Sequence, residues 1–152
     1  MKTFNGAVLW TLTLVLILSF LSCDPISSLE CEIFNKTEDT VTVVMYKDIM
    51  SSSYNGYAIV ENDSVTTHYD ADSCNVAVLA PNQVLKAQYE WSGLYREEFV
   101  APLWKYIKSI KTGDEELAPA LWNNEAAWVM KIKGGGRFEG ESRYYSLILR
   151  DR

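Results

Sequence analysis

Thr-Val-Thr-Val-Val-Met-Tyr, at residues 40–46, is the most strand-like stretch of this chain. Its β-branched threonines and valines fit a pleated, half-buried surface and disfavour a helix. Upstream, residues 30–35 alternate enough to form a second strand, and the polar run Lys36-Thr37-Glu38-Asp39 between the two is typical of a turn. We therefore predict a β-hairpin over residues 30–46.

Short apolar runs separated by turn-forming residues recur along the rest of the chain. The predicted strands are 57–60, 65–69, 76–79, 84–91, 129–133 and 143–149. Residues 99–111 fit either a helix or a strand, and a short helix could begin at Pro119. Many short strands with frequent turns indicate a sandwich or barrel. We predict a mainly β chain: a single small antiparallel β-sandwich-like domain over residues 30–152, with at most one or two short helices.

The N-terminus has the pattern of an export signal. Lys2 supplies one positive charge, and residues 6–21 form an almost wholly apolar segment without a charged residue. This arrangement is typical of a signal peptide, and the segment is slightly short for a spanning helix, which needs about 20 apolar residues. Residues 1–22 are therefore predicted to be a cleaved signal. An uncleaved signal anchor and plain secretion are the alternatives.

The residues at the predicted cleavage site suggest a lipid modification. Phe20-Leu21-Ser22-Cys23 resembles the lipobox of bacterial lipoproteins, in which a small residue precedes an invariant cysteine. The resemblance implies that Cys23 becomes the mature N-terminus and carries a diacylglycerol and an amide-linked fatty acid such as palmitate. Residues 23–29 would then be a lipidated cysteine and tether, and the small β-domain would resemble those of many envelope lipoproteins of Gram-negative bacteria. The implied location is the cell envelope, on a membrane, facing the periplasm or the cell surface.

Charge and cysteine content narrow the possible partners. The formal net charge is −6, which argues against a nucleic-acid partner, because phosphate binding needs clustered lysine and arginine. The chain has three cysteines, and lipidation of Cys23 would leave an even pair. Cys31 and Cys74 could form a disulfide, which exported compartments allow, or they could be two separate buried thiols.

One cluster has residue types suited to metal binding or catalysis. His68, Asp70, Asp72 and Cys74 alternate, so an extended backbone would put them on one face. Imidazole, carboxylate and thiolate are metal ligands. However, His68 is the only histidine and no second ligand cluster accompanies it. We therefore interpret the stretch as a solvated loop and predict neither a metal nor a cofactor.

Two further groups of residues have a possible binding or modification role. Asp39-Thr40-Val41 and Asp63-Ser64-Val65 match a short motif that some bacteria use for O-glycosylation, which makes Thr40 and Ser64 candidate acceptors. Aromatic faces bind sugars and peptides but also fill cores, and core packing is the favoured interpretation of the aromatic set. That set is Trp91, Tyr95, Trp104, Tyr106, Trp122 and Trp128.

The sequence supports three functional hypotheses. The first is a non-enzymatic, membrane-anchored lipoprotein that binds a protein or glycan or supports an envelope assembly. The second is an envelope hydrolase or metal-dependent enzyme that uses His68, Asp70 and Asp72. The third is an inhibitor or immunity-type protein that blocks an enzyme through an acidic face. We favour the first.

Overall fold

The computed structural model describes residues 25–46, 56–70, 75–93, 101–135 and 140–151. Within these ranges two β-sheets carry the fold and no α-helix is present, which confirms the mainly β, sandwich-like prediction. No helix in this part of the chain is long and apolar enough to cross a bilayer. The predicted signal peptide, Cys23, Asp72, Cys74 and Tyr95 lie outside the described residues.

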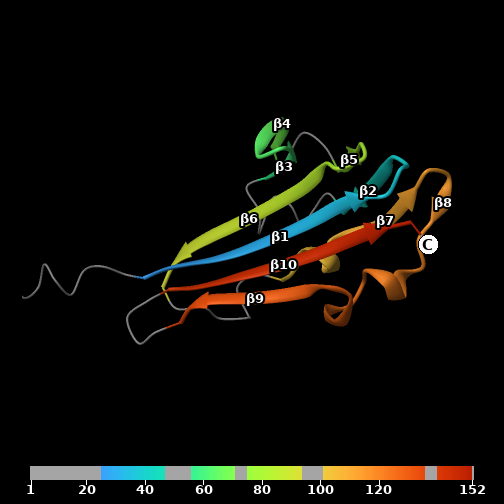
Figure 1. Cartoon of the computed structure of the whole chain (residues 1–152). Helices are drawn as coiled ribbons and strands as arrows, with labels where there is room; N and C mark the ends of the chain where they lie inside the picture. Colours follow the sequence, from blue (N-terminus) through green and yellow to red (C-terminus); the bar gives the residue numbers. More distant parts are fainter. Residues whose placement is uncertain (1–24, 47–55, 71–74, 94–100, 136–139, 152) are drawn as a thin grey trace, which may run out of the picture.

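The larger sheet has six strands in the order β4-β3-β6-β1-β10-β9 (Figure 1). They are β1 (Ile26–Lys36), β3 (Gly56–Glu61), β4 (Ser64–Asp70), β6 (Val84–Ser92), β9 (Val129–Gly134) and β10 (Glu141–Arg150). Neighbouring strands are antiparallel except β1 and β10, which run parallel. A tight turn cannot join a parallel pair. The six-stranded sheet is therefore complete only when β10, the last described strand, pairs with β1, the first.

The smaller sheet has four strands in the order β5-β2-β7-β8. They are β2 (Val41–Met45), β5 (Val76–Leu79), β7 (Ile107–Thr112) and β8 (Glu115–Glu116). Three short 3-10 turns accompany it: η1 (Leu103–Lys105), η2 (Pro119–Leu121) and η3 (Glu125–Ala127). The ambiguous segment 99–111 thus contains one turn followed by a strand, and the helix considered at Pro119 is a single 3-10 turn.

The core lies between the two sheets and is completed by aromatic side chains. Along β1, buried residues alternate with half-exposed ones, as expected of a strand with one face inward. The Trp104 ring centroid lies 4.9 Å from that of Tyr145 and 5.3 Å from that of Trp128. Trp104, Tyr106, Trp122 and Trp128 are all buried, which confirms the core interpretation for these four members of the aromatic set.

The predicted hairpin over residues 30–46 is wrong, because β1 and β2 belong to different sheets. Asn35 explains the change of sheet. Its buried side chain donates hydrogen bonds to the carbonyl oxygens of Asp39 and Leu79, at 2.8 and 3.0 Å. Its side-chain oxygen accepts from the N–H and hydroxyl of Thr37, at 3.0 and 2.7 Å. These bonds fix the bend after β1 so that the chain crosses to the smaller sheet.

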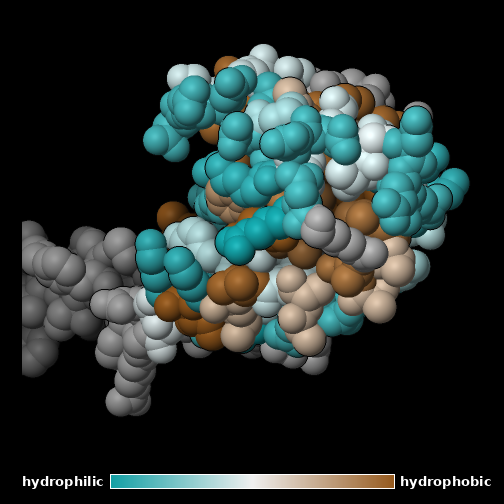
Figure 2. Space-filling model, turned by 45° about the vertical axis from the view of Figure 1, so that its right-hand side comes forward, coloured by the Kyte–Doolittle hydropathy of each residue, from teal (hydrophilic) through white to brown (hydrophobic). Residues whose placement is uncertain are grey.

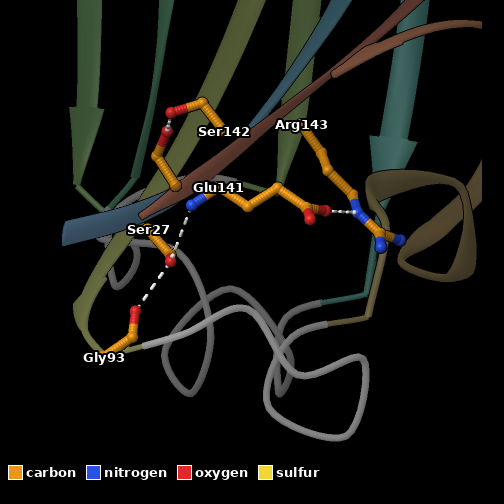
Figure 3. A network of polar contacts seen from close by, with 6 residues as sticks. Ser27, Gly93, Glu141, Ser142 and Arg143 are labelled. Atoms are coloured by element: carbon orange, nitrogen blue, oxygen red, sulfur yellow. Dashed lines mark hydrogen bonds and ion pairs between the residues drawn. The ribbon is translucent and has the colours of Figure 1, made fainter. Parts of the chain in front are cut away.

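The predicted tether, residues 23–29, is also too long, because β1 begins at Ile26 and Ser27 and Leu29 are buried. The Ser27 hydroxyl donates to the carbonyl oxygen of Gly93 at 2.7 Å and accepts from the Glu141 N–H at 3.1 Å (Figure 3). Gly140 packs so closely that an added Cβ would collide with the carbonyl oxygen of Ile26. Serine, normally a turn signal, here satisfies backbone groups inside the fold.

Candidate binding surfaces

The outer face of the larger sheet, turned away from the smaller one, carries a charged cluster on its central strands. Glu30 and Glu32 of β1 share this face, and Lys86 of β6 lies opposite Glu32. The Lys86 ammonium lies 2.7 Å from a Glu32 carboxylate oxygen, and that contact raises the pKa of Lys86. Partial burial, followed by repulsion from Glu32, raises the pKa of Glu30. Lys86 thus pairs with Glu32, and Glu30 leaves the cluster with one unbalanced negative charge when it is ionised.

A shallow hollow of about 410 Å³ adjoins this cluster. Strands β3, β4 and β6 line it, with Tyr57, Val65 and Gln88 among its walls. Small-molecule sites are usually enclosed and mainly apolar, with a few converging polar groups. The polar residues that line this hollow, Lys86, Gln88 and Glu90, are bonded to one another or to Glu32, and the hollow is open. It is therefore a weaker candidate than the edge of the same sheet.

Strand β9 forms that edge and exposes apolar side chains. Val129, Met130 and Ile132 are 56, 42 and 49% exposed. Every residue of β9 is exposed, whereas its neighbour β10 has three buried side chains. In the space-filling view, brown and tan residues gather in the lower part of the face, at the height of β9 and the turns before it (Figure 2). Contiguous exposed apolar surface marks interaction sites more often than scattered single residues do.

Buried tryptophans hold the start of this exposed strand in place. Trp128 directly precedes β9, and its indole N–H donates to the carbonyl oxygen of Trp122 at 2.8 Å. The Asn124 side chain caps η3 by accepting from the Ala127 N–H at 3.1 Å. On the strand itself, the Lys133 ammonium lies 4.9 Å from the centre of the Tyr144 ring. The exposed edge thus follows a mostly exposed segment that two buried tryptophans, Trp122 and Trp128, attach to the core.

The stretch from His68 to Cys74, which we interpreted as a solvated loop instead of a metal or catalytic cluster, is only partly described. His68 and Asp70 lie on β4, the other edge of the larger sheet, where they pair with Ala58 and Gly56. Asp72 and Cys74 fall outside the described residues. No group of three or more ligand-type side chains that could hold a metal occurs within the described ranges.

The two candidate glycosylation sites are exposed, whereas Cys31 of the predicted disulfide is buried. Thr40 and Ser64 are both exposed, each beside a turn. The Asn62–Asp63 turn before Ser64 has φ values of 49° and 63°, as expected for a tight hairpin between β3 and β4. Cys31 is buried in β1 within the core. Because Cys74 lies outside the described residues, the disulfide between Cys31 and Cys74 stays a prediction.

The sequence alone does not predict two features of the fold, the edge position of β9 and the buried position of Asn35. The edge position of β9 depends on pairing between β1 and β10, which no local pattern reveals. Lys131 and Lys133 do offer a signal, because lysines commonly protect edge strands. Asn35 offers none, since asparagine beside a turn is ordinary and its burial follows from the crossing between sheets.

Comparison of the chain with protein-family models, with curated protein sequences and with solved structures finds no match.

Proposed function

We propose that this chain is a non-enzymatic bacterial envelope lipoprotein, anchored through Cys23, whose β-sandwich binds another envelope component. The observation that carries the binding role is the exposed apolar edge strand β9, held in place by buried tryptophans. An edge strand with exposed apolar side chains is a template on which another chain can pair, and Lys131 and Lys133 limit which chains can do so. The resemblance of residues 20–23 to a lipobox supports the anchor.

The early start of β1 would hold the anchored domain close to the membrane. Ile26 begins the strand three residues after Cys23, and three extended residues span about 10 Å. A domain anchored through Cys23 would therefore stand against the membrane surface instead of ranging freely above it. Its membrane-proximal end would be the one that contains Ser27, Gly93 and Glu141, shown in Figure 3.

The anchor is tested by expressing the full-length chain in a Gram-negative host. We expect mass spectrometry of the mature N-terminal peptide to show a triacylated Cys23, and labelled palmitate to enter the protein. Cys23→Ser should abolish both the label and membrane retention, while the matched control Cys74→Ser keeps both. An unmodified Cys23, or a mature chain that starts elsewhere, would overturn the anchor.

A further inference from the structure

Strand β9 ends the larger sheet, so one side of its backbone has no strand to pair with in the described chain. Its backbone pairs with β10, from Val129 opposite Ser146 to Gly134 opposite Glu141. Among the described residues, no other backbone hydrogen bond is made by this strand. An edge of this kind can accept an extended peptide as an additional strand, with main-chain hydrogen bonds supplying much of the affinity.

The side chains of β9 specify what kind of strand would fit. Lys131 lies opposite Tyr144 on the outer face, and Lys133 lies on the same face. Met130 and Ile132 occupy the alternate positions, opposite Tyr145 and Arg143. The strand has two lysines and no acid, in a chain whose formal net charge is −6. A complementary strand would alternate acidic residues with apolar ones.

A second copy of this chain is a poor occupant of the same edge. Antiparallel pairing of two β9 strands about Lys131 sets lysine directly opposite lysine. Pairing about Ile132 sets Lys131 opposite Lys133 twice. Like charges directly opposite each other across a strand pair are destabilising. In these two registers, which pair the most residues of β9, the lysines disfavour self-association and favour a partner of opposite charge.

We propose that β9 docks an extended segment of a partner protein in which acidic and apolar residues alternate, added to the larger sheet beyond β9. The acidic side chains would lie opposite Lys131 and Lys133, and the apolar ones beside Met130 and Ile132. This inference rests on the proposed binding role and names the chemistry of the partner. It is independent of lipidation at Cys23, so the two can fail separately.

The probe is a short capped peptide that alternates glutamate and valine, titrated against the full-length chain in detergent. Fluorescence anisotropy should show binding that weakens as salt is added. A lysine–valine peptide should not bind. The double variant Lys131→Glu with Lys133→Glu should lower the affinity for the glutamate–valine peptide by about tenfold or more. The same variant should bind the lysine–valine peptide.

A matched charge change elsewhere separates local recognition from net charge. Lys108 and Lys111 are exposed on β7 of the smaller sheet, and changing both to glutamate should leave binding intact. Hydrogen exchange should show added protection in β9 and none in β4. Thermal unfolding confirms that each variant is folded.

Several results would overturn the proposal. They are the absence of binding to the wild-type chain, equal weakening by both double variants, protection in β4 instead of β9, or a wild-type dimer that buries β9.

Discussion

Asn35→Ala tests the crossing between the two sheets. The Asn35 side chain is fully buried and makes four hydrogen bonds, two as donor to Asp39 and Leu79 and two as acceptor from Thr37. Its backbone also binds the turn that leads into β6, with the Asn35 N–H donating to Gln83 at 3.0 Å. One residue therefore fixes both the exit from β1 and the return from β5.

The size of the effect follows from these contacts. A hydrogen bond contributes about 1 kcal/mol net, and a buried group left without a partner costs about 1–3 kcal/mol. Alanine removes the four bonds, and the space it leaves lets some of the abandoned groups find water. We expect a loss of about 3–4 kcal/mol in the free energy of unfolding. This is a large share of the roughly 5–15 kcal/mol that stabilises a typical domain.

Urea unfolding followed by tryptophan fluorescence measures this loss, because the buried tryptophans report on the core. Thr37→Val removes only the hydroxyl, which contacts Asn35 and the carbonyl oxygen of Asp39, and should cost about 1 kcal/mol. In the double variant the valine should cost less than it does alone, since only the contact of the hydroxyl with the Asp39 carbonyl oxygen is left to lose. A loss below about 1 kcal/mol for Asn35→Ala, or full additivity, would refute the role assigned to this network.

Three further perturbations test the core, the outer face and the N-terminal packing. Trp104→Ala should destabilise the domain by about 3–5 kcal/mol and weaken the near-ultraviolet circular dichroism that its contacts with Trp128 and Tyr145 produce. The raised pKa of Glu30 means that its ionised form disfavours folding. Glu30→Gln should therefore stabilise the domain at pH 7, and the gain should shrink as the pH falls to the ordinary carboxyl range in denaturant titrations. Gly140→Ala should cost about 1–3 kcal/mol in the same assay, because its methyl group meets the Ile26 backbone.

Local pattern predicted most of the strands, because alternation and β-branched residues report directly on a half-buried pleated surface. The strand predicted at residues 76–79 has the bounds of β5. Local pattern did not predict which strands pair. A turn signal such as residues 36–39 looks the same whether the chain folds back on itself or crosses to the other sheet.

The segment 101–128 shows why some local structure escapes prediction. Its apolar spacing fits helix and strand about equally, and packing decides between them. Trp104, Trp122 and Trp128 enter one core cluster from three places in the chain. Short 3-10 turns suit that purpose, because each directs one indole inward and then lets the backbone change direction. The energy that selects these turns lies in contacts distant in sequence.

The candidate surface depends on the same long-range contacts. Residues 129–133 were predicted as a strand, yet only the pairing of β1 with β10 makes that strand an edge. By contrast, His68 and Asp70 drew attention through residue type, although β4 gives them no described cluster of ligands.

The proposed anchor and the proposed docking edge are linked by strand direction. β1 runs away from Cys23, and β9 runs back toward the end where β1 begins. Gly134 pairs with Glu141, whose N–H binds Ser27, so β9 ends close to the start of β1. Because three residues span at most about 10 Å, one end of a docked strand would lie at the bilayer if Cys23 carries the anchor. A partner attached to the same membrane by a short linker would meet this edge at a high effective concentration. A modest affinity of β9 for an acidic strand would then be sufficient.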